Sequence, residues 1–576
     1  MSRTNGAATA DMGSEAAESI APEGNVLALV DPLSFGGAMV RTAVGALKNP
    51  QRLAGAFSRY AVDMTRATLS TTARAFGAES EPAIEPGRKD RRFADVAWRD
   101  NPFLSMLLQS YLLWGRLAHE VVDVAAPELD PATAEKAGFL TEVVVDALAP
   151  SNVAFLNPAV RKKWLDTGGL SALRGLRTFM DDLATNGGLP RQVDPHAFTV
   201  GEDLACTPGK VVFRNDLMEL IQYAPQTEQV HRIPLLLSPP WINKYYIMDL
   251  APGRSFAEWA VQHGHTVFAI SYRNPDERHR DVRLDDYLLS GPLAAIDVVQ
   301  DITGAEQVNI VGLCLGGTLT TALLAYMASR GDDRVRSATL LNTLVDFSQP
   351  GRLGAFTDVG TVEHLERRMA KRGYMESTDM AGVFTFMRGN DLVWNYVVNN
   401  WLLGEKPPAF DILSWNADGT RMPAKMHSFY IRSCYIGNEL ARGQMELAGT
   451  VIDPTAIGED VYVLAAREDH IVPWDGSYKT TQVLRSANVR FVQSASGHIA
   501  GIVNPPSPKA WYRTNGETPA DSREWLEGSV EHRGSWWEDW TEWIAQRAGE
   551  MVDPPALGSD ANPPQGDAPG EYVLGK

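Results

Sequence analysis

Residues 308–328 read VNIVGLCLGGTLTTALLAYMA, an uncharged stretch that holds the most informative pattern in the chain. The apolar run 308–311 suits a buried strand, and 318–328 suits a buried helix. Between them, glycines lie two positions before and two and three positions after Cys314. Only small neighbours fit around a side chain that a sharp strand-to-helix turn presents to solvent. The stretch therefore predicts a strand, a tight turn that carries an exposed cysteine, and a helix, rather than a membrane span.

A nucleophile on such a turn predicts an α/β-hydrolase fold and acyl-transfer chemistry. The start of the following helix stabilises a thiolate at Cys314 and presents the backbone N–H of Leu315 to an oxyanion. In this fold the acid and then the base follow the nucleophile at later strand ends. Asp469 follows the predicted strand 461–465, and His498 follows the next one. We predict Cys314 as nucleophile, Asp469 as acid and His498 as base.

Each of these residues also has a simpler interpretation. A cysteine in an apolar run is often a buried structural thiol, and an aspartate after a strand is often a helix cap. His470 competes with His498 as the base, although it stands at the acid position. Cys206 and Cys434 have no comparable turn, so we interpret both as structural.

The second oxyanion donor in this fold comes from the loop after an early strand, here 238–243 (SPPWIN). The backbone N–H of Trp241 is the candidate. The alternative is that the two prolines only shape a turn and that Trp241 only packs.

The rest of the chain predicts two folded regions. Residues 1–25 are rich in Ala, Glu, Ser and Gly and predict a disordered tail, whereas 26–193 predicts a mainly helical domain. Strand-like and helical runs alternate over 194–551, as in a sheet flanked by helices. This alternation lapses over about 343–453, which predicts an inserted cap, and 552–576 predicts a loose C-terminal tail. The predicted strands are 210–214, 218–223, 234–238, 266–271, 308–311, 338–342, 461–465 and 489–492.

Charge and cysteine content exclude several classes of protein. A formal net charge of −18 without a long basic run argues against nucleic-acid binding. Three cysteines in 576 residues do not suit a disulfide framework and favour a reducing, cytoplasmic setting. The small, acidic residues 1–24 lack the basic start and apolar core of a signal peptide.

The chain resembles the polyhydroxyalkanoate synthases over nearly all of its length. The resemblance lies in the glycine-flanked cysteine motif around Cys314 and in several longer stretches. These are DRRFADVAW (90–98), PPWINKYYIMDL (239–250), GHTVFAISYRNP (264–275), NDLVWNYVVNN (390–400), WNADGTRMP (415–423), REDHIVPW (467–474), SGHIAGIVNPP (496–506) and GSWWEDW (534–540).

The resemblance implies an acyltransferase that polymerises (R)-3-hydroxyacyl-CoA into polyester and releases CoA. Cys314 would carry the growing chain as a thioester, with His498 as general base and Asp469 helping it to activate the 3-hydroxyl of the monomer. No metal or prosthetic group is expected, because the CoA thioester is itself a substrate. The resemblance also implies a homodimer that lies on cytoplasmic polyester granules, among granule-associated proteins. Within the family, the chain looks most like the single-subunit class I enzymes, which favour short-chain monomers.

Two rival functions use the same sequence features. A cysteine-dependent hydrolase of esters, lactones or thioesters would use the same three residues with water as the acceptor. A granule-coat or scaffold protein could keep the fold without activity, but it would have no need of Cys, Asp and His at three strand ends.

Overall fold

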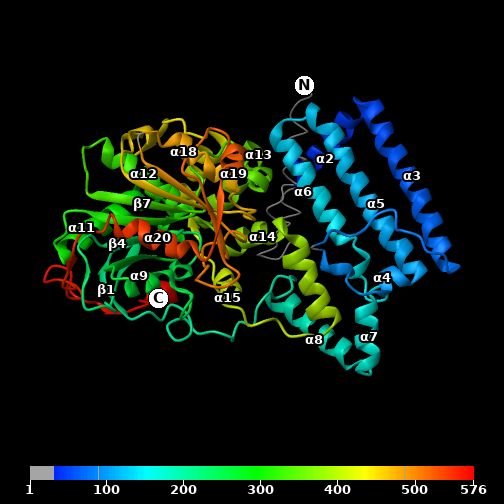
Figure 1. The fold of residues 1–576 in the computed structure, drawn as a ribbon, viewed down its shortest axis with the longest axis horizontal. Helices are drawn as coiled ribbons and strands as arrows, with labels where there is room; N and C mark the ends of the chain where they lie inside the picture. Colours follow the sequence, from blue (N-terminus) through cyan, green and yellow to red (C-terminus); the bar gives the residue numbers. More distant parts are fainter. Residues whose placement is uncertain (1–31, 89, 486, 576) are drawn as a thin grey trace. The chain divides into compact units, whose positions relative to one another are not determined.

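The computed structural model describes residues 32–88, 90–485 and 487–575, and the chain forms two compact units (Figure 1). The predicted disordered tail, 1–25, lies outside the described residues. The helical unit comprises the described residues up to Asp194, together with Gly354–Thr361 and Thr378–Pro408. The sheet unit comprises Pro195–Leu353, Val362–Ser377 and Ala409–Lys576.

Capping residues and prolines define the helix starts of the helical unit. Asn101, Asp130 and Asn157 each accept a backbone N–H from the first turn of the helix that follows, and a proline occupies the first position of each helix. Its helices are α2 (Pro32–Leu47), α3 (Pro50–Ala75), α4 (Ala97–Asp100), α5 (Pro102–Ala125), α6 (Pro131–Ala147), α7 (Pro158–Asp166), α8 (Leu170–Thr185) and α14 (Ser377–Met387). None of the described helices combines the length and the hydropathy that a membrane span requires.

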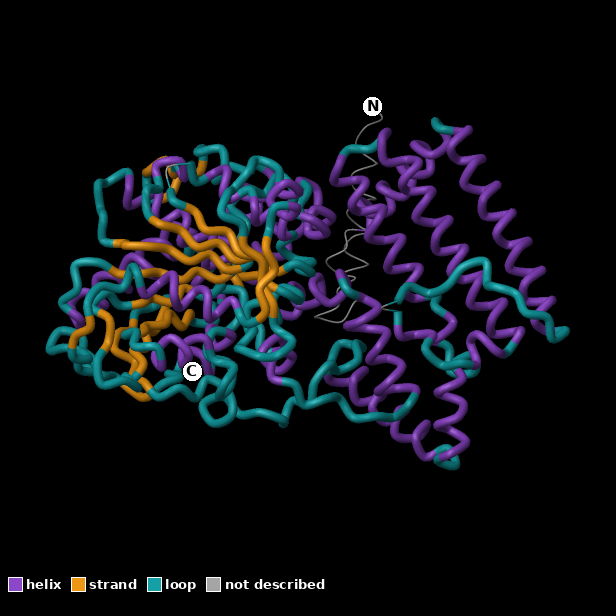
Figure 2. The backbone as a smooth tube through the Cα atoms, viewed as in Figure 1, coloured by secondary structure: helices purple, strands orange, loops and turns teal. Residues whose placement is uncertain are grey.

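One mixed sheet organises the sheet unit (Figure 2). Its eleven described strands are arranged in the order β15-β14-β13-β12-β7-β6-β4-β5-β2-β1-β17. The six strands from β13 to β5 are parallel, and antiparallel strands extend both edges. The strands are β1 (Gly209–Arg214), β2 (Met218–Tyr223), β4 (Leu235–Ser238), β5 (Val267–Tyr272), β6 (Val308–Leu313), β7 (Val335–Leu341), β12 (Asp460–Ala466), β13 (Val489–Ser494), β14 (Trp511–Thr514), β15 (Val530–Arg533) and β17 (Gly566–Asp567).

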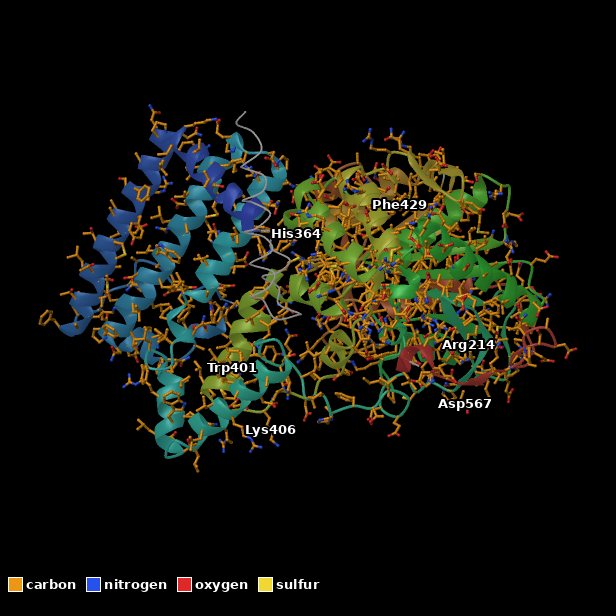
Figure 3. The ribbon with its side chains drawn as sticks, turned by 180° about the vertical axis from the view of Figure 1, so that it is seen from behind. Arg214, His364, Trp401, Lys406, Phe429 and Asp567 are labelled. Carbon is orange, nitrogen blue, oxygen red and sulfur yellow. The ribbon has the colours of Figure 1, made fainter. Side chains whose placement is uncertain are left out.

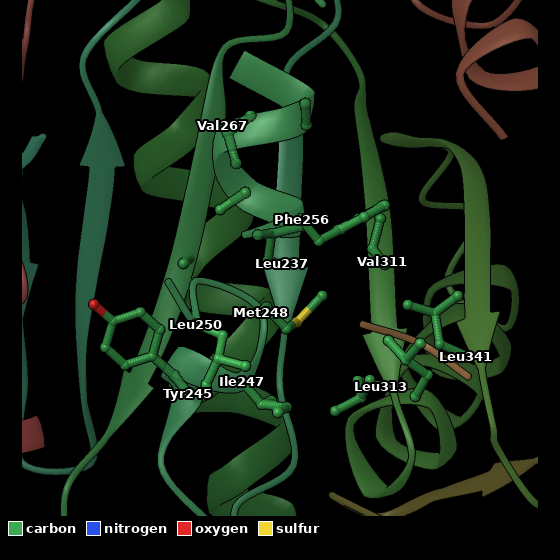
Figure 4. Close-up of a cluster of buried hydrophobic side chains, with 14 of the residues drawn as sticks. Leu237, Tyr245, Ile247, Met248, Leu250, Phe256, Val267, Val311, Leu313 and Leu341 are labelled. Carbon is green, nitrogen blue, oxygen red and sulfur yellow. The ribbon is translucent and has the colours of Figure 1, made fainter. Parts of the chain in front are cut away.

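Alternating side chains of these strands face two layers of helices, as the period of two in a strand requires. Leu237, Val311 and Leu341 point to one face, where they join Phe256 of α9 (Phe256–Gln262) in a single buried cluster (Figure 4). Four tryptophans of α20 (Trp536–Ala545) belong to the same cluster. On the other face, α12 (Leu315–Ala328) packs against β4, β6 and β7. The predicted α/β-hydrolase architecture is confirmed.

The predicted cap does not form one body. Gly354–Thr361 and Thr378–Pro408 belong to the helical unit, whereas the rest of 343–453 belongs to the sheet unit. Side-chain contacts within the helical unit explain the assignment, because Lys136 of α6 bonds to both Asp358 and Thr361. Helix α13 (Val359–Arg372) begins in the helical unit, and most of it, from Val362 on, belongs to the sheet unit. The other helical elements of the portion in the sheet unit are α15 (Asp411–Ala417), α16 (Ala424–Tyr430) and the π-helix η11 (Ile431–Ile436).

The prediction of a loose C-terminal tail over 552–576 is wrong. Strand β17, which carries Asp567, pairs antiparallel with β1, which carries Arg214 (Figure 3). Arg214 also forms an ion pair with Glu571. The buried carboxylate of Glu219 accepts the backbone N–H groups of Glu571 and Tyr572 at 3.0 and 2.9 Å. Backbone hydrogen bonds hold this Pro- and Gly-rich segment in place, and they need no run of apolar side chains. The amino-acid composition therefore does not reveal that the segment is ordered.

Candidate active site

Cys314 stands between strand β6 and helix α12, where the chain turns sharply. Its φ angle is 52°, a value that residues other than glycine rarely adopt. The backbone N–H of Cys314 donates to the carbonyl of Leu341 on β7, at 2.8 Å. The turn therefore holds Cys314 in a strained conformation, as the sequence predicts for a nucleophile on an elbow.

The glycines around Cys314 are required because no side chain would fit at their positions. A Cβ atom on Gly316 would lie 2.0 Å from the carbonyl oxygen of Ser238, and one on Gly317 would lie 1.9 Å from Oγ1 of Thr343. A Cβ atom on Gly312 would lie 2.6 Å from the Cα of Gly317. The first turn of α12 therefore packs against the loop after β4 more closely than any side chain would allow.

Asp469 and His498 meet at the ends of adjacent parallel strands, β12 and β13. The Nδ1 atom of His498 lies 2.6 Å from Oδ2 of Asp469, and both side chains are buried. The other carboxylate oxygen of Asp469 accepts the backbone N–H groups of Ile471 and Val472, each at 2.9 Å. Asp469 is thus both a local turn cap and the partner of a histidine. This geometry favours His498 over His470 as the base.

The charge balance around His498 links it to Cys314 as well. Burial lowers the pKa of His498, but the negative charges of Asp469 and Cys314, and hydrogen bonds to both, outweigh burial and raise this pKa to about 10. Since the causes of this rise include Cys314, the imidazole lies close to a sulfur that is half-buried. The Nδ1 side of the ring faces Asp469, which leaves Nε2 for the sulfur.

Asn342 was not predicted as part of the site. It follows β7 with a φ angle of 44°, its Oδ1 accepts the N–H of Ala466 at 2.8 Å, and its Nδ2 donates to the carbonyl of His498. One amide thus connects the ends of the strands that carry Asp469 and His498. The available signal was a buried asparagine at the end of an apolar strand.

The other two cysteines differ from Cys314 in environment. Cys434 is fully buried in η11, and burial raises the pKa of its thiol. Burial and the charge of Asp249 raise the pKa of Cys206 as well. Both thiols are therefore less prone to ionise than a free cysteine, as structural thiols are.

Comparisons with known proteins show the family to which the chain belongs. A family model described as "Poly-beta-hydroxybutyrate polymerase (PhaC) N-terminus" matches residues 89–260, and an α/β-hydrolase-fold model matches 243–505. A poly(3-hydroxyalkanoate) polymerase of Methylorubrum extorquens is 45% identical over 93% of this chain and 89% of its own length. The chain belongs to the poly(3-hydroxyalkanoate) polymerase family. A relative from Rhizobium meliloti, named a polymerase subunit, is 41% identical over 89% of this chain and 83% of its own length, and one from Cupriavidus necator is 42% identical over 84% and 83%.

The Trp241 side chain packs in the wall of the site. The loop that carries it lies against Gly316, and its ring is buried, with centroids 5.5 Å from Tyr287 and 5.9 Å from Tyr430. The side chain therefore packs, as the alternative interpretation holds. The roles of the Trp241 and Leu315 backbone N–H groups as oxyanion donors stay predictions.

The fold also places two tyrosines beside Cys314 that were not predicted from the sequence. Tyr430 ends α16 and Tyr435 lies in η11, with their ring centroids 5.7 Å apart. Residues five apart stack along a π-helix, so η11 brings both rings to one side. Burial raises the pKa of each phenol, and the charges of Cys314 and Cys434 add to the rise. Both phenols therefore stay neutral around pH 7.

Proposed function

We propose that this chain polymerises (R)-3-hydroxyacyl-CoA thioesters into a polyhydroxyalkanoate polyester and releases CoA, with Cys314 as the covalent nucleophile. The relatives are named as poly(3-hydroxyalkanoate) polymerases, which are acyltransferases. The observation that carries the proposal is the placement of His498 between the Asp469 carboxylate and the Cys314 sulfur. The thiolate and imidazolium that this placement favours are the reactive form of a cysteine acyltransferase.

In the loading step, the Cys314 thiolate attacks the thioester carbonyl of the substrate. The carbon–sulfur bond to CoA then breaks, and the CoA sulfur takes the proton from His498, which leaves CoA thiol, an acyl thioester on Cys314 and a neutral imidazole. One thioester is exchanged for another, so the step is close to energetically even. A thiolate also leaves more readily than an alkoxide, which favours acyl transfer.

Acylation prepares His498 for the next step. The acylated sulfur carries no charge, so two of the interactions that raise the His498 pKa are lost and the imidazole becomes able to accept a proton. It then takes the proton from the 3-hydroxyl of an incoming monomer while that oxygen attacks the Cys314 thioester. An ester bond forms and the Cys314 thiolate is released. Attack of Cys314 on the CoA thioester of the extended chain returns the chain to the enzyme and releases CoA.

Asp469 keeps the imidazole oriented through both steps, because its carboxylate holds Nδ1 and leaves Nε2 toward the sulfur. We assign the oxyanion contacts to the backbone N–H groups of Leu315 and Trp241. Leu315 is the first residue of α12, so its N–H has no partner within that helix. The scheme needs no metal or prosthetic group, since every proton moves between His498, the hydroxyl and the two sulfurs.

We further propose that the enzyme is a homodimer that works on cytoplasmic granules of its own polyester, alongside granule-associated proteins. These assignments rest on family membership and on the separate helical unit, which has no part in the chemistry described above.

The deciding experiment gives purified protein (R)-3-hydroxybutyryl-CoA, follows the release of free thiol and sediments the acyl product. The expected result is CoA release together with insoluble polyester, with Cys314→Ala losing both by at least about a thousandfold. Cys206→Ala is the matched control and should keep full activity. CoA release with only free hydroxy acid would make the protein a thioesterase, and no release with short or longer acyl chains would favour a scaffold.

A further inference from the structure

The residues that follow β7 stand between the strands that lead to the candidate active site. In the sheet, β7 lies between β6, which leads into the elbow, and β12, which leads into the loop of the acid. Leu341, the last residue of β7, is in register with Leu313 of β6 (Figure 4) and with Leu464 of β12. Because parallel strands end at one edge of a sheet, the next two residues, Asn342 and Thr343, reach both neighbouring strand ends.

Thr343 contacts the elbow on the side of β6. Its hydroxyl donates to the carbonyl of Cys314 at 3.3 Å and to that of Leu341 at 3.1 Å. The same carbonyl of Leu341 accepts the N–H of Cys314 at 2.8 Å. The side chain of Thr343 also lies against the first turn of α12, where a Cβ atom on Gly317 would lie 1.9 Å from Oγ1. The end of β7 therefore contacts both the N–H and the carbonyl group of Cys314.

Asn342 contacts the strand end on the other side. Its backbone N–H donates to the carbonyl of Leu464 at 2.8 Å, and its Oδ1 accepts the N–H of Ala466 at 2.8 Å. Its Nδ2 donates to the carbonyl of His498, in the loop after β13. The φ angle of 44° turns the chain away from the strand direction at Asn342, a conformation that asparagine adopts more readily than most residues. One side chain thus spans the end of β12 and reaches the backbone of the base.

We propose that Asn342 and Thr343 form a bracket that positions Cys314 and His498 for proton exchange between the sulfur and the imidazole. The inference rests on the proposed function, which assigns these two residues as nucleophile and base. Both bracket side chains are fully buried, so water does not replace a bond that either one loses. Asn342 and Thr343 act through the backbone of the reacting residues, so both are positioning residues.

The bracket has a consequence for the charge balance of the site. The charge of Cys314 acts on His498 more strongly the closer the sulfur lies to the imidazole. Loss of either half of the bracket lets the elbow or the loop of His498 relax, which weakens this interaction. The pKa of His498, which lies at about 10 in the intact site, should then fall.

Two substitutions test the bracket. Thr343→Val keeps nearly the same shape and removes the hydroxyl, whereas Asn342→Gly removes both side-chain bonds and tolerates the positive φ angle. We expect each to lower kcat for CoA release from (R)-3-hydroxybutyryl-CoA by at least about tenfold, with KM changed by less than about twofold. In histidine NMR titration, each should also lower the pKa of His498. Thr343→Ser keeps the hydroxyl and should restore most of the activity.

The matched controls remove the same kinds of bond elsewhere in the sheet unit. The hydroxyl of Thr481 donates to the carbonyl of Tyr478 at 2.8 Å. The amide of Asn215 accepts the N–H of Leu217 and donates to the carbonyl of Ser290, each at 2.8 Å. Thr481→Val and Asn215→Gly should lower Tm without changing kcat or the titration of His498.

A double-mutant cycle with Cys314→Ala shows whether Thr343 acts through the sulfur. In Cys314→Ala, adding Thr343→Val should leave the pKa of His498 unchanged, because the charge that the hydroxyl helps to position is absent. If Thr343→Val lowers this pKa equally with and without Cys314, the bracket does not act between nucleophile and base, and the inference is overturned.

The inference also fails if both bracket variants lower Tm but match the controls in kcat and in the titration of His498. Asn342 and Thr343 would then only stabilise the strand ends. The titration needs no turnover, so it tests the bracket independently of the proposed function. A fall in the His498 pKa in both variants of a protein that releases no CoA would support the bracket and refute the proposed function alone.

Discussion

The Nδ1 atom of His498 lies 2.6 Å from the Oδ2 atom of Asp469, 29 positions apart in the chain, and both side chains are withdrawn from solvent. An ion pair in such a place depends on its geometry and on further hydrogen bonds, since burial penalises both charges. Here two backbone N–H groups hold the second carboxylate oxygen, and Asn342 holds the backbone of His498. The pair is thus supported from three sides.

Asp469→Asn should separate the two tasks of this side chain. The amide oxygen can still accept the N–H groups of Ile471 and Val472, but the amide no longer stabilises an imidazolium or fixes its tautomer. We expect CoA release to fall by about 10²–10⁴-fold with little loss of fold. Asp521→Asn is the control, since Asp521 only caps a helix. If Asp469→Asn and Asp521→Asn both lower CoA release only slightly and to the same extent, Asp469 serves only as a turn cap.

The titration of His498 should depend on the state of Cys314. Burial lowers its pKa, while Asp469 and Cys314 together raise it to about 10. In Cys314→Ala the contributions of the sulfur disappear, so the pKa should fall clearly below 10. Histidine NMR titration of isotope-labelled protein measures it, with Cys206→Ala expected to keep the value near 10. An unchanged titration in Cys314→Ala would contradict the thiolate–imidazolium pair.

Gly316→Ala should disrupt the elbow. The added methyl group would lie 2.0 Å from the carbonyl oxygen of Ser238, so the first turn of α12 must move away from the loop that carries Trp241. We expect CoA release to fall at least about 100-fold, because a shift of about 1 Å at reacting groups costs that much. Gly458→Ala is the control in the same unit, since a Cβ atom there meets nothing within 4 Å. Full activity of Gly316→Ala would refute a close-packed elbow.

Buried His265 should make the protein acid-sensitive. Burial lowers its pKa to about 3, and the charges of His231 and His263 act in the same direction. An unfolded histidine takes up a proton near pH 6.5, so the stability that neutral His265 contributes is lost as pH falls from about 6.5 toward 3. At pH 4.5 the loss is about 3 kcal/mol.

His265→Phe should therefore lose less stability between pH 7 and 4.5 than the unmodified protein. Urea midpoints at the two pH values measure the difference. His119→Phe, at an exposed site of α5, should leave the pH dependence as it is. The prediction fails if His265→Phe and the unmodified protein lose equal stability on acidification.

Removing residues 553–576 should destabilise the sheet unit. The truncation exposes the edge of β1 and leaves the buried carboxylate of Glu219 without the N–H groups of Glu571 and Tyr572. Lost hydrogen bonds to a buried charge cost about 1.5–3 kcal/mol each, so Tm should fall by at least about 5 °C. Deleting only 575–576 is the control. An unchanged Tm in the longer truncation would restore the view of a loose tail.

The features that the sequence predicted correctly are those with a local physical cause. A strand, three glycines and an apolar helix around Cys314 define the elbow because the turn tolerates no other side chains. The eight predicted strands all occur. Six of them are the parallel strands from β13 to β5, and a buried parallel strand needs a continuous apolar run. The added edge strands β14, β15 and β17 escaped prediction, because their side chains are largely half-exposed or exposed and carry no such run.

The sequence sufficed for the family resemblance, the order of Cys314, Asp469 and His498 along the chain, and the strands at whose ends these residues stand, because each is written in a short run of neighbouring residues. The contact between His498 and Asp469, the bridge made by Asn342, the tyrosines beside Cys314 and the division of the predicted cap between two units all join residues far apart in the chain. Such contacts depend on strand register and on which side chains pack together, and only the folded chain defines these.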